Sequence, residues 1–174
     1  MASPRDIILG DGIFSYGDAL TTATLTDIAV TRGGGNFTVT NTFRQQLADG
    51  DFGFVKGRIA IDEQVATLTV RALEMLPAAV NDFYPAMHSS AGAAVTTITG
   101  LMEVAAGDYK KVKWTGKTKG NNAVTITVDN AINMDPLSWD LIDKDEVVPK
   151  LVFTATSLEA STSTPSWTVE FATT

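Results

Sequence analysis

Two long segments of this sequence alternate apolar and polar residues with a period of two. A period of two places successive side chains on opposite faces of a β-strand, whereas a helix requires a period of 3.6. In the first segment, Asn36 to Gln45, the apolar face holds Phe37, Val39 and Phe43, and the polar face holds Thr38, Thr40, Thr42 and Arg44. We therefore expect a long strand with one apolar face here.

The second alternating segment, Val55 to Arg71, changes phase along its length. Its first part places Val55, Gly57, Ile59 and Ile61 on one face. After Asp62-Glu63-Gln64 the phase shifts, so that Ala66, Leu68, Val70 and Ala72 oppose Thr67, Thr69 and Arg71. Between the two segments, Leu47 to Phe54 is a polar, glycine-containing loop around Asp49-Gly50-Asp51, which is ordinary turn chemistry.

Shorter strands are expected through the rest of the chain. Gly10-Asp11-Gly12 indicates a tight hairpin, and a second hairpin is expected between Tyr109–Thr115 and Ala123–Val128. Leu73 to Phe83 keeps helical spacing, but Pro77 and Pro85 limit that helix to about two turns. Further elements are expected at Leu25–Thr31, Thr96–Val104, Asp135–Leu141 (a short turn of helix), Val147–Leu158 and Trp167–Phe171. The pattern predicts a single, mainly β domain over residues 1–174: a β-sandwich or split barrel with a short flanking helix.

Composition excludes several classes of function. The chain has 174 residues, no cysteine and one histidine, so thiolate zinc sites and multi-histidine sites are impossible. Its formal net charge of −7 gives no electrostatic attraction to nucleic acid phosphates. The N-terminus lacks the apolar core of a signal peptide, and the chain has no membrane span, so we expect a soluble chain made in the cytoplasm.

No residue pattern indicates catalysis, a metal or a cofactor. His88 stands beside Ser89 without a nucleophile-elbow motif, and a loop histidine is the simpler interpretation. The acidic residues around Lys144 lack the spacing of a calcium loop. Gly33-Gly34-Gly35 is not followed by a P-loop lysine, so it is expected to let strands reverse or a neighbouring backbone approach. The lysines from Lys110 to Lys119 are expected to form a polar strand face that discourages edge pairing.

One charge-poor stretch favours assembly. Ala91 to Leu101 is apolar and prone to form strands, and such a surface on a free monomer invites aggregation. We expect it either in the core or buried by a partner subunit.

The order of several short motifs resembles the tail tube (major tail) proteins of siphophages. The motifs are Asp6-Ile7-Ile8-Leu9-Gly10, Thr31-Arg32-Gly33-Gly34-Gly35, Asp49-Gly50-Asp51, Val55-Lys56-Gly57-Arg58, Ala72-Leu73-Glu74, Asp145-Glu146-Val147-Val148 and Pro165-Ser166-Trp167. They span nearly the whole chain. The resemblance implies a virion protein of the phage tail, made in the host cytoplasm, whose hexameric rings stack into a hollow tube around an inner β-barrel. Its partners would be further copies of itself, a tape-measure protein and the tail-terminator and tail-tip proteins, with double-stranded DNA passing through without specific binding.

The resemblance assigns candidate positions to three kinds of contact. The loop between the long strands would lie at a rim of the ring and make the inter-ring contact, through Leu47, Asp49, Asp51, Phe52 and Phe54. The polar strand face would line the lumen, through Thr38, Thr40, Thr42, Arg44, Thr67, Thr69 and Arg71. Charged contacts between subunits would come from Asp143, Asp145 and Glu146. No cofactor is implied.

Two other classes of function compete with this interpretation. A carbohydrate- or receptor-binding β-sandwich of a virion or cell-surface protein would use exposed aromatics as sugar platforms, with Trp114, Trp139 and Trp167 as candidates. A hydrolase would need two carboxylates at a defined separation, and no motif here specifies such a pair. We therefore expect that the chain is not an enzyme.

Overall fold

The computed structural model describes residues 7–18, 25–27, 31–73, 77–85, 87–158 and 164–172. Its strands are β1 (Ile8–Asp18), β2 (Thr26–Asp27), β3 (Thr31–Gln45), β4 (Ile59–Ala72), β5 (Met87–Ala91), β6 (Thr96–Gly100), β7 (Lys110–Thr118), β8 (Ala123–Asn133), β9 (Lys150–Ala155) and β10 (Trp167–Phe171). The helical elements among these residues are one α-helix, α1 (Pro77–Phe83), and a 3-10 turn at Ala106–Asp108. The prediction of a mainly β chain with a short helix is confirmed.

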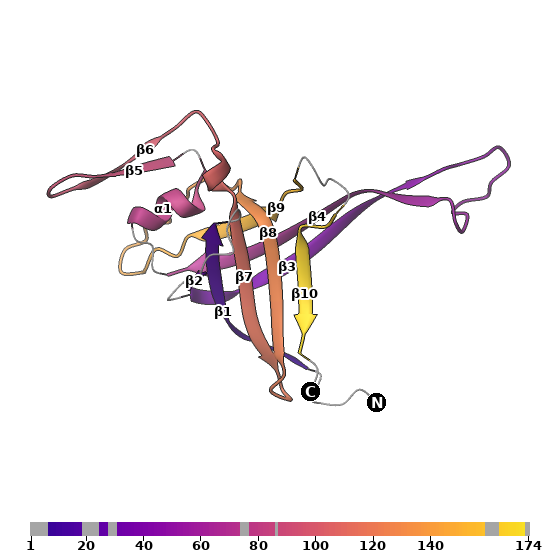
Figure 1. The fold of residues 1–174 in the computed structure, drawn as a ribbon, viewed down its shortest axis with the longest axis horizontal. Helices are drawn as coiled ribbons and strands as arrows, with labels where there is room; N and C mark the ends of the chain where they lie inside the picture. The colour runs from indigo at the N-terminus through magenta and orange to yellow at the C-terminus, as the bar shows by residue number, and fades with distance from the viewer. Residues whose placement is uncertain are drawn as a thin grey trace.

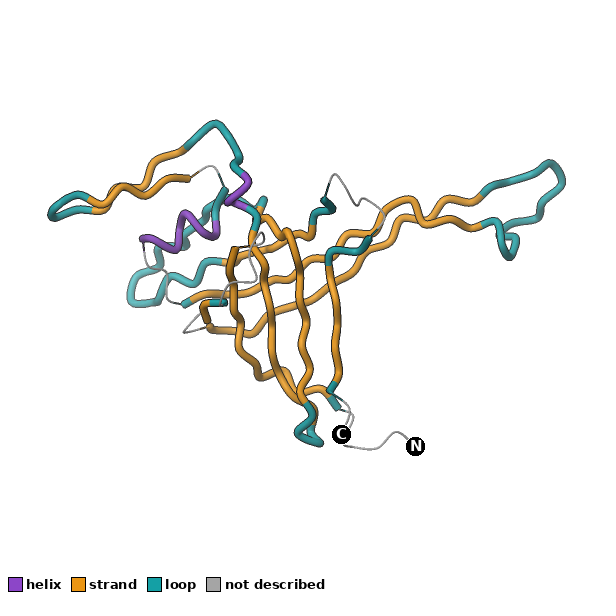
Figure 2. The backbone as a smooth tube through the Cα atoms, in the orientation of Figure 1, coloured by secondary structure: helices purple, strands orange, loops and turns teal. Residues whose placement is uncertain are grey.

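Eight of the strands form one curled antiparallel sheet, an open half-barrel (Figures 1 and 2). The strand order is β2-β1-β7-β8-β9-β4-β3, and β10 also pairs with β8. The branch at β8 causes the curl, because its first half pairs with β10 and its last residues, Ala131 to Asn133, pair with β9. β5 and β6 form a separate hairpin beside α1.

The core lies between the two walls of the half-barrel. Phe14 and Trp114 face inward from one wall, and Leu68 and Phe153 face inward from the other. Helix α1 adds Phe83, whose ring packs edge-on against Phe153 with 6.0 Å between centroids. Burial of such side chains contributes about 25 cal/mol per Å² of apolar surface, so the sheet and the helix stabilise one another.

The glycine triplet allows neighbouring parts of the chain to approach β3 closely, which is one of the two roles that the sequence predicts for it. The β3–β4 register shifts between Thr31 and Gly35, and Gly34 has a φ of 72°, a backbone conformation that suits glycine. A Cβ on Gly35 would collide with the ring of Phe14 and the carbonyl oxygen of Thr69. The triplet therefore lies within β3 and lets the facing wall pack directly on the backbone.

Three local predictions are wrong. Gly10-Asp11-Gly12 is not a hairpin, because β1 runs through it with only a register shift between Ile8 and Gly12. A Cβ on Gly12 would meet the Trp114 indole, so this glycine serves packing. The segment from Asp135 to Leu141 contains no helix. His88 lies in β5, paired with Thr99, and not in a loop.

Candidate functional site

The longest pair of strands leaves the body of the molecule as a two-stranded arm. β3 and β4 run side by side past the end of the sheet and finish in a loop, residues 46–58 (Figures 1 and 2). β9 pairs with β4 only from Thr67 to Arg71, so nearer the tip, among the described residues, β3 and β4 have only each other for backbone pairing. The sequence predicts both strands and the loop, but not that they leave the body.

The apolar row that faces the core continues along the arm. In antiparallel pairing, directly opposed residues share a face. Phe37 opposes Leu68 within the body, and Phe43 opposes Ile61 on the arm. Between them, Asn41 and Gln64 oppose one another and are joined by a hydrogen bond of 2.8 Å. A face that begins in the core therefore ends in solvent.

A β-bulge at Asp62 keeps this row on one face. Thr42 pairs with Glu63 and Phe43 pairs with Ile61, which leaves Asp62 as the extra residue. If Asp62 were paired like its neighbours, Ile61 would face away from the core residues Ala66 and Leu68. Odd- and even-numbered residues of a regular strand point to opposite faces. The phase shift that follows Ile61 in the sequence corresponds to this bulge in the structure. Nε of Arg44 forms an ion pair with Oδ1 of Asp62 at 3.1 Å.

The arm exposes a large apolar area. The side chains that contribute are Phe43, Leu47, Phe52, Phe54, Ile59 and Ile61. Phe52 is fully exposed, and Phe54 is 81% exposed. Since a large side chain carries roughly 150–250 Å², the set exposes on the order of 700 Å². A typical monomer's largest contiguous apolar patch is about 300–600 Å², and the summed exposed area of these six side chains is of that order or above it.

The loop at the tip is held by hydrogen bonds within itself. Oδ2 of Asp51 accepts the backbone N–H of Ala48 at 2.8 Å and Nη1 of Arg58 at 2.7 Å. Nε2 of Gln45 donates to the carbonyl oxygen of Gly53 at 2.6 Å. The Asp51 side chain is only 17% exposed, so it organises the loop, whereas Leu47, Phe52 and Phe54 point into solvent. Asp49 is also exposed.

The candidate lumen residues share one face, opposite to the apolar row. Thr38 directly opposes Thr67, and Thr67 in turn opposes Thr154 of β9. Arg71 opposes Lys150 in the same way. The remaining members of the set, Thr40, Thr42, Arg44 and Thr69, follow from the same alternation along β3 and β4. The face is polar and rich in threonine, and Arg44 on it is neutralised by Asp62.

Two of the three candidate acidic residues, Asp145 and Glu146, pair with Arg32 of β3. Nη1 of Arg32 forms ion pairs with Glu146 and, at 3.5 Å, with Asp145. Hydrogen bonds from the Glu146 backbone, together with the charge of Arg32, lower the pKa of Asp145 below its ordinary value. Asp143 is 91% exposed, 4.0 Å from Lys144. The structure therefore places Asp145 and Glu146 in a loop contact with β3, and it leaves Asp143 in solvent.

A second exposed element is the β5–β6 hairpin, which contains most of the charge-poor stretch from Ala91 to Leu101. Residues 91–101 are exposed apart from a partly covered Ile98, and the hairpin projects from the body on the side away from the arm (Figure 1). Of the two expectations for this stretch, the core position is therefore wrong. Leu101, Met102 and Val104, which follow it, are also exposed.

A cleft opens where the arm meets the body. Its volume is about 710 Å³, and its lining includes Asp62, Glu63, Gln64 and Trp167. The Trp167 indole N–H donates to Oε1 of Gln64 at 3.1 Å, and its ring packs on Phe37 with centroids 5.8 Å apart. Of the other tryptophans, Trp114 is in the core and Trp139 is 47% exposed.

Sequence reasoning identified the apolar faces but missed their exposure. The pattern placed Phe43, Ile59 and Ile61 on apolar strand faces, because periodicity records which side chains share a face. It does not record whether anything covers that face. The polar pair Asn41 and Gln64 interrupts the row where the arm leaves the body. That interruption was the available signal. Among the described residues, no group of three or more His, Asp and Glu side chains is placed to hold a metal ion.

Comparison with protein-family models and with curated proteins finds no match for this chain. The helix within the described ranges, α1, is too short and too polar to cross a membrane.

Proposed function

We propose that this chain is the structural subunit of a bacteriophage tail tube, whose hexameric rings stack into a hollow conduit for DNA. The observation that carries the proposal is the exposed apolar row on the β3–β4 arm. Each partner in a stable protein–protein interface buries roughly 800 Å², and the arm alone offers an apolar area of that order. A second copy of the chain is the partner that a self-assembling subunit requires.

The open sheet supports assembly through further strand pairing. β3 is an edge strand of the half-barrel, and no strand in the described part of the chain pairs with its outer edge, which presents backbone N–H and C=O groups for pairing. Isolated long edges invite uncontrolled aggregation, and closing strands around a ring removes them. An inner β-barrel built from several subunits would close this edge and leave the threonine-rich face of β3 and β4 toward the lumen.

The chemistry of that face suits a conduit. Hydroxyl groups and charge-paired residues such as Arg44 and Asp62 give a DNA backbone little to adhere to, because affinity for phosphates comes from unpaired Lys and Arg. The net charge of −7 adds a weak overall repulsion. On this proposal the protein is a virion component and carries no catalytic site.

A loop-shortening experiment tests the role of the arm. Gln46 N–H bonds to the carbonyl oxygen of Arg58 at 2.9 Å, so residues 47–57 can be replaced by an Asn-Gly turn without disturbing the strands. We expect this variant to keep the wild-type melting temperature and to lose tube growth, followed by electron microscopy. A matched variant with Leu47, Phe52 and Phe54 changed to serine keeps the loop length and should fail in the same way. Normal polymerisation of the shortened variant would refute the assignment.

A second candidate function is a carbohydrate-binding module of a virion or cell surface. The cleft at the base of the arm favours it, because carboxylates, an amide and an indole line one opening. A glycan that binds a stable monomer, and loses affinity on Trp167→Ala, would support this alternative. A protein that assembles without binding glycans would support the tube.

A further inference from the structure

The half-barrel leaves part of its core open along a seam. The walls do not meet between β3 on one side and β1 and β10 on the other, and a cavity of about 220 Å³ lies there. Phe37, Trp114 and Ile126 contribute to its walls, and Ile8 and Val169 form part of its rim. None of the described residues that line it is charged, so an apolar group could enter without desolvating any of their side chains.

The cavity has the size of one aromatic ring. An apolar protein cavity of about 150 Å³ is large enough to hold benzene, so 220 Å³ accommodates the side chain of a phenylalanine. The walls supply aromatic rings from Phe14, Phe37 and Trp114. Aromatic pairs in edge-to-face contact contribute beyond their buried area, so the cavity favours an aromatic occupant over an aliphatic one.

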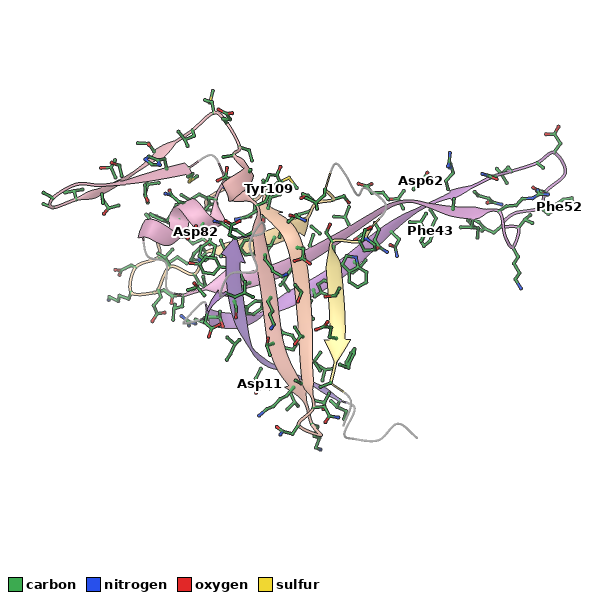
Figure 3. All side chains as sticks on the ribbon, viewed as in Figure 1. Asp11, Phe43, Phe52, Asp62, Asp82 and Tyr109 are labelled. Carbon is green, nitrogen blue, oxygen red and sulfur yellow. The ribbon has the colours of Figure 1, made fainter. Side chains whose placement is uncertain are left out.

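The same chain carries one aromatic side chain that is fully exposed on a rigid support. Phe52 lies at the far end of the arm (Figure 3). The Asp51, Arg58 and Gln45 hydrogen bonds fix the loop that presents it. Because the loop is already ordered, binding through Phe52 would lose little conformational entropy.

Phe52 cannot reach the cavity of its own chain, because the arm projects away from the body (Figure 1). The strand from Asn41 to the end of β3 at Gln45 extends roughly 13 Å at about 3.3 Å per residue, and the loop carries Phe52 further from the body, toward an adjacent copy. We propose that Phe52 of one copy inserts into the seam cavity of the next copy, with Leu47 and Phe54 covering the rim. The area offered by the arm matches one side of a stable interface, and the three side chains placed at the contact, Leu47, Phe52 and Phe54, are apolar.

The contact joins two different surfaces, so it is heterologous. Heterologous contacts repeat from copy to copy, and they generate closed rings or open filaments according to the rotation between copies. This inference rests on the proposed function, for which it names the arm's acceptor site.

A double-mutant cycle on the full-length protein tests the insertion. Phe52→Ala removes the inserted ring, and Val169→Trp fills the cavity from its half-exposed rim. We expect each variant to raise the critical concentration for assembly at least roughly tenfold. The double variant should be no worse than the more affected single variant, because both changes break the same contact. Additive effects would overturn the inference, as would wild-type assembly by either single variant.

A cross-link gives an independent readout, because the chain contains no cysteine. Oxidation of assembled Phe52→Cys/Val169→Cys protein should give a ladder of covalent oligomers, since every copy carries both partners. Phe52→Cys/Thr127→Cys, with its second cysteine on the outer face of β8, should give none.

Tubes that form without the ladder would overturn the insertion and leave the proposed function standing. A wild-type protein that never assembles, even on tail tips, would refute both.

Discussion

Nη1 of Arg58 donates a hydrogen bond to Oδ2 of Asp51 at 2.7 Å, and the same carboxylate oxygen accepts the backbone N–H of Ala48. One carboxylate thus joins the two sides of the arm's loop. The loop is far from the hydrophobic core, so these bonds contribute to the shape of the tip more than to the stability of the fold. An ordered tip presents its apolar side chains ready for contact.

Replacing Asp51 should weaken assembly while leaving the stability of the fold nearly unchanged. We expect Asp51→Ala to leave the melting temperature within about 2 °C of wild type, because an exposed-loop ion pair contributes only about 0–1 kcal/mol. Assembly should need several-fold more protein, since the loop must then be ordered on binding. Light scattering across a concentration series measures this. Asp49→Ala is the control, because its side chain is exposed and should be dispensable. Equal behaviour of the two variants would count against preorganisation.

The bulge at Asp62 is expected to set the direction of the arm. Deleting Asp62 leaves Thr42 opposite Glu63 and Phe43 opposite Ile61 in regular pairing, so the apolar row stays on one face. The bend and extra twist of the bulge would be lost. We expect the deletion to preserve the circular dichroism spectrum and to weaken assembly by about tenfold or more. Asp62→Ala, which retains the bulge, should assemble almost normally. A deletion variant that forms normal tubes would show that arm direction is unimportant.

The alternating pattern predicted several strands at their observed positions. β10 was expected at Trp167 to Phe171 and occurs there, and the second hairpin joins β7 to β8 as expected. The predictions failed where turn-forming residues serve another purpose. Gly12 leaves space for the Trp114 indole inside a continuous strand, and a glycine that permits packing looks the same in sequence as one that permits a turn.

The candidate site was predictable only in part. Sequence alone located the loop and its apolar residues, because a polar loop between two alternating segments is a local property. It could not show that Asp51 turns inward, or that Asp145 and Glu146 reach Arg32. Those contacts depend on how distant segments fold together. The seam cavity could not be predicted from the sequence for the same reason. Its lining residues come from β1, β3, β4, β7, β8 and β10.

Packing at Gly35 gives a prediction for stability. A Cβ at this position would collide with the Phe14 ring and the Thr69 carbonyl oxygen. We expect Gly35→Ala to destabilise the fold by about 1–3 kcal/mol, the usual range for overpacking a well-packed site. Gly100→Ala is the matched control, because no atom lies within 4 Å of the added Cβ. Chemical denaturation compares the two, and equal midpoints would contradict the packing described here.

Two tyrosines, the buried Tyr84 and the partly buried Tyr16, predict the response to alkali. Burial raises the pKa of Tyr84, with a further contribution from the charge of Asp135, and burial with the nearby Asp82 raises that of Tyr16. The folded state therefore holds these protons more tightly than the unfolded state. This contribution to stability is complete below the unfolded pKa of about 10 and is lost as pH rises through the folded pKa.

Tyr84→Phe isolates one of these groups. The Tyr84 hydroxyl has no hydrogen-bond partner within the described part of the chain, so its removal should leave stability at pH 7 unchanged or raise it by up to about 2 kcal/mol. Above pH 10 the variant should lose stability less steeply than wild type. Denaturant midpoints from pH 7 to pH 11 would measure both effects. A large loss at neutral pH would instead indicate that the hydroxyl has a partner.

Negative-stain electron microscopy of the purified protein over a range of concentrations tests the central claim most directly. We predict hollow rings or tubes with a channel wide enough for a DNA duplex, either spontaneously or after tail tips are added to initiate growth. Monomers that persist at every concentration, and that also fail to extend added tail tips, would contradict the account of this chain as a self-assembling tube subunit.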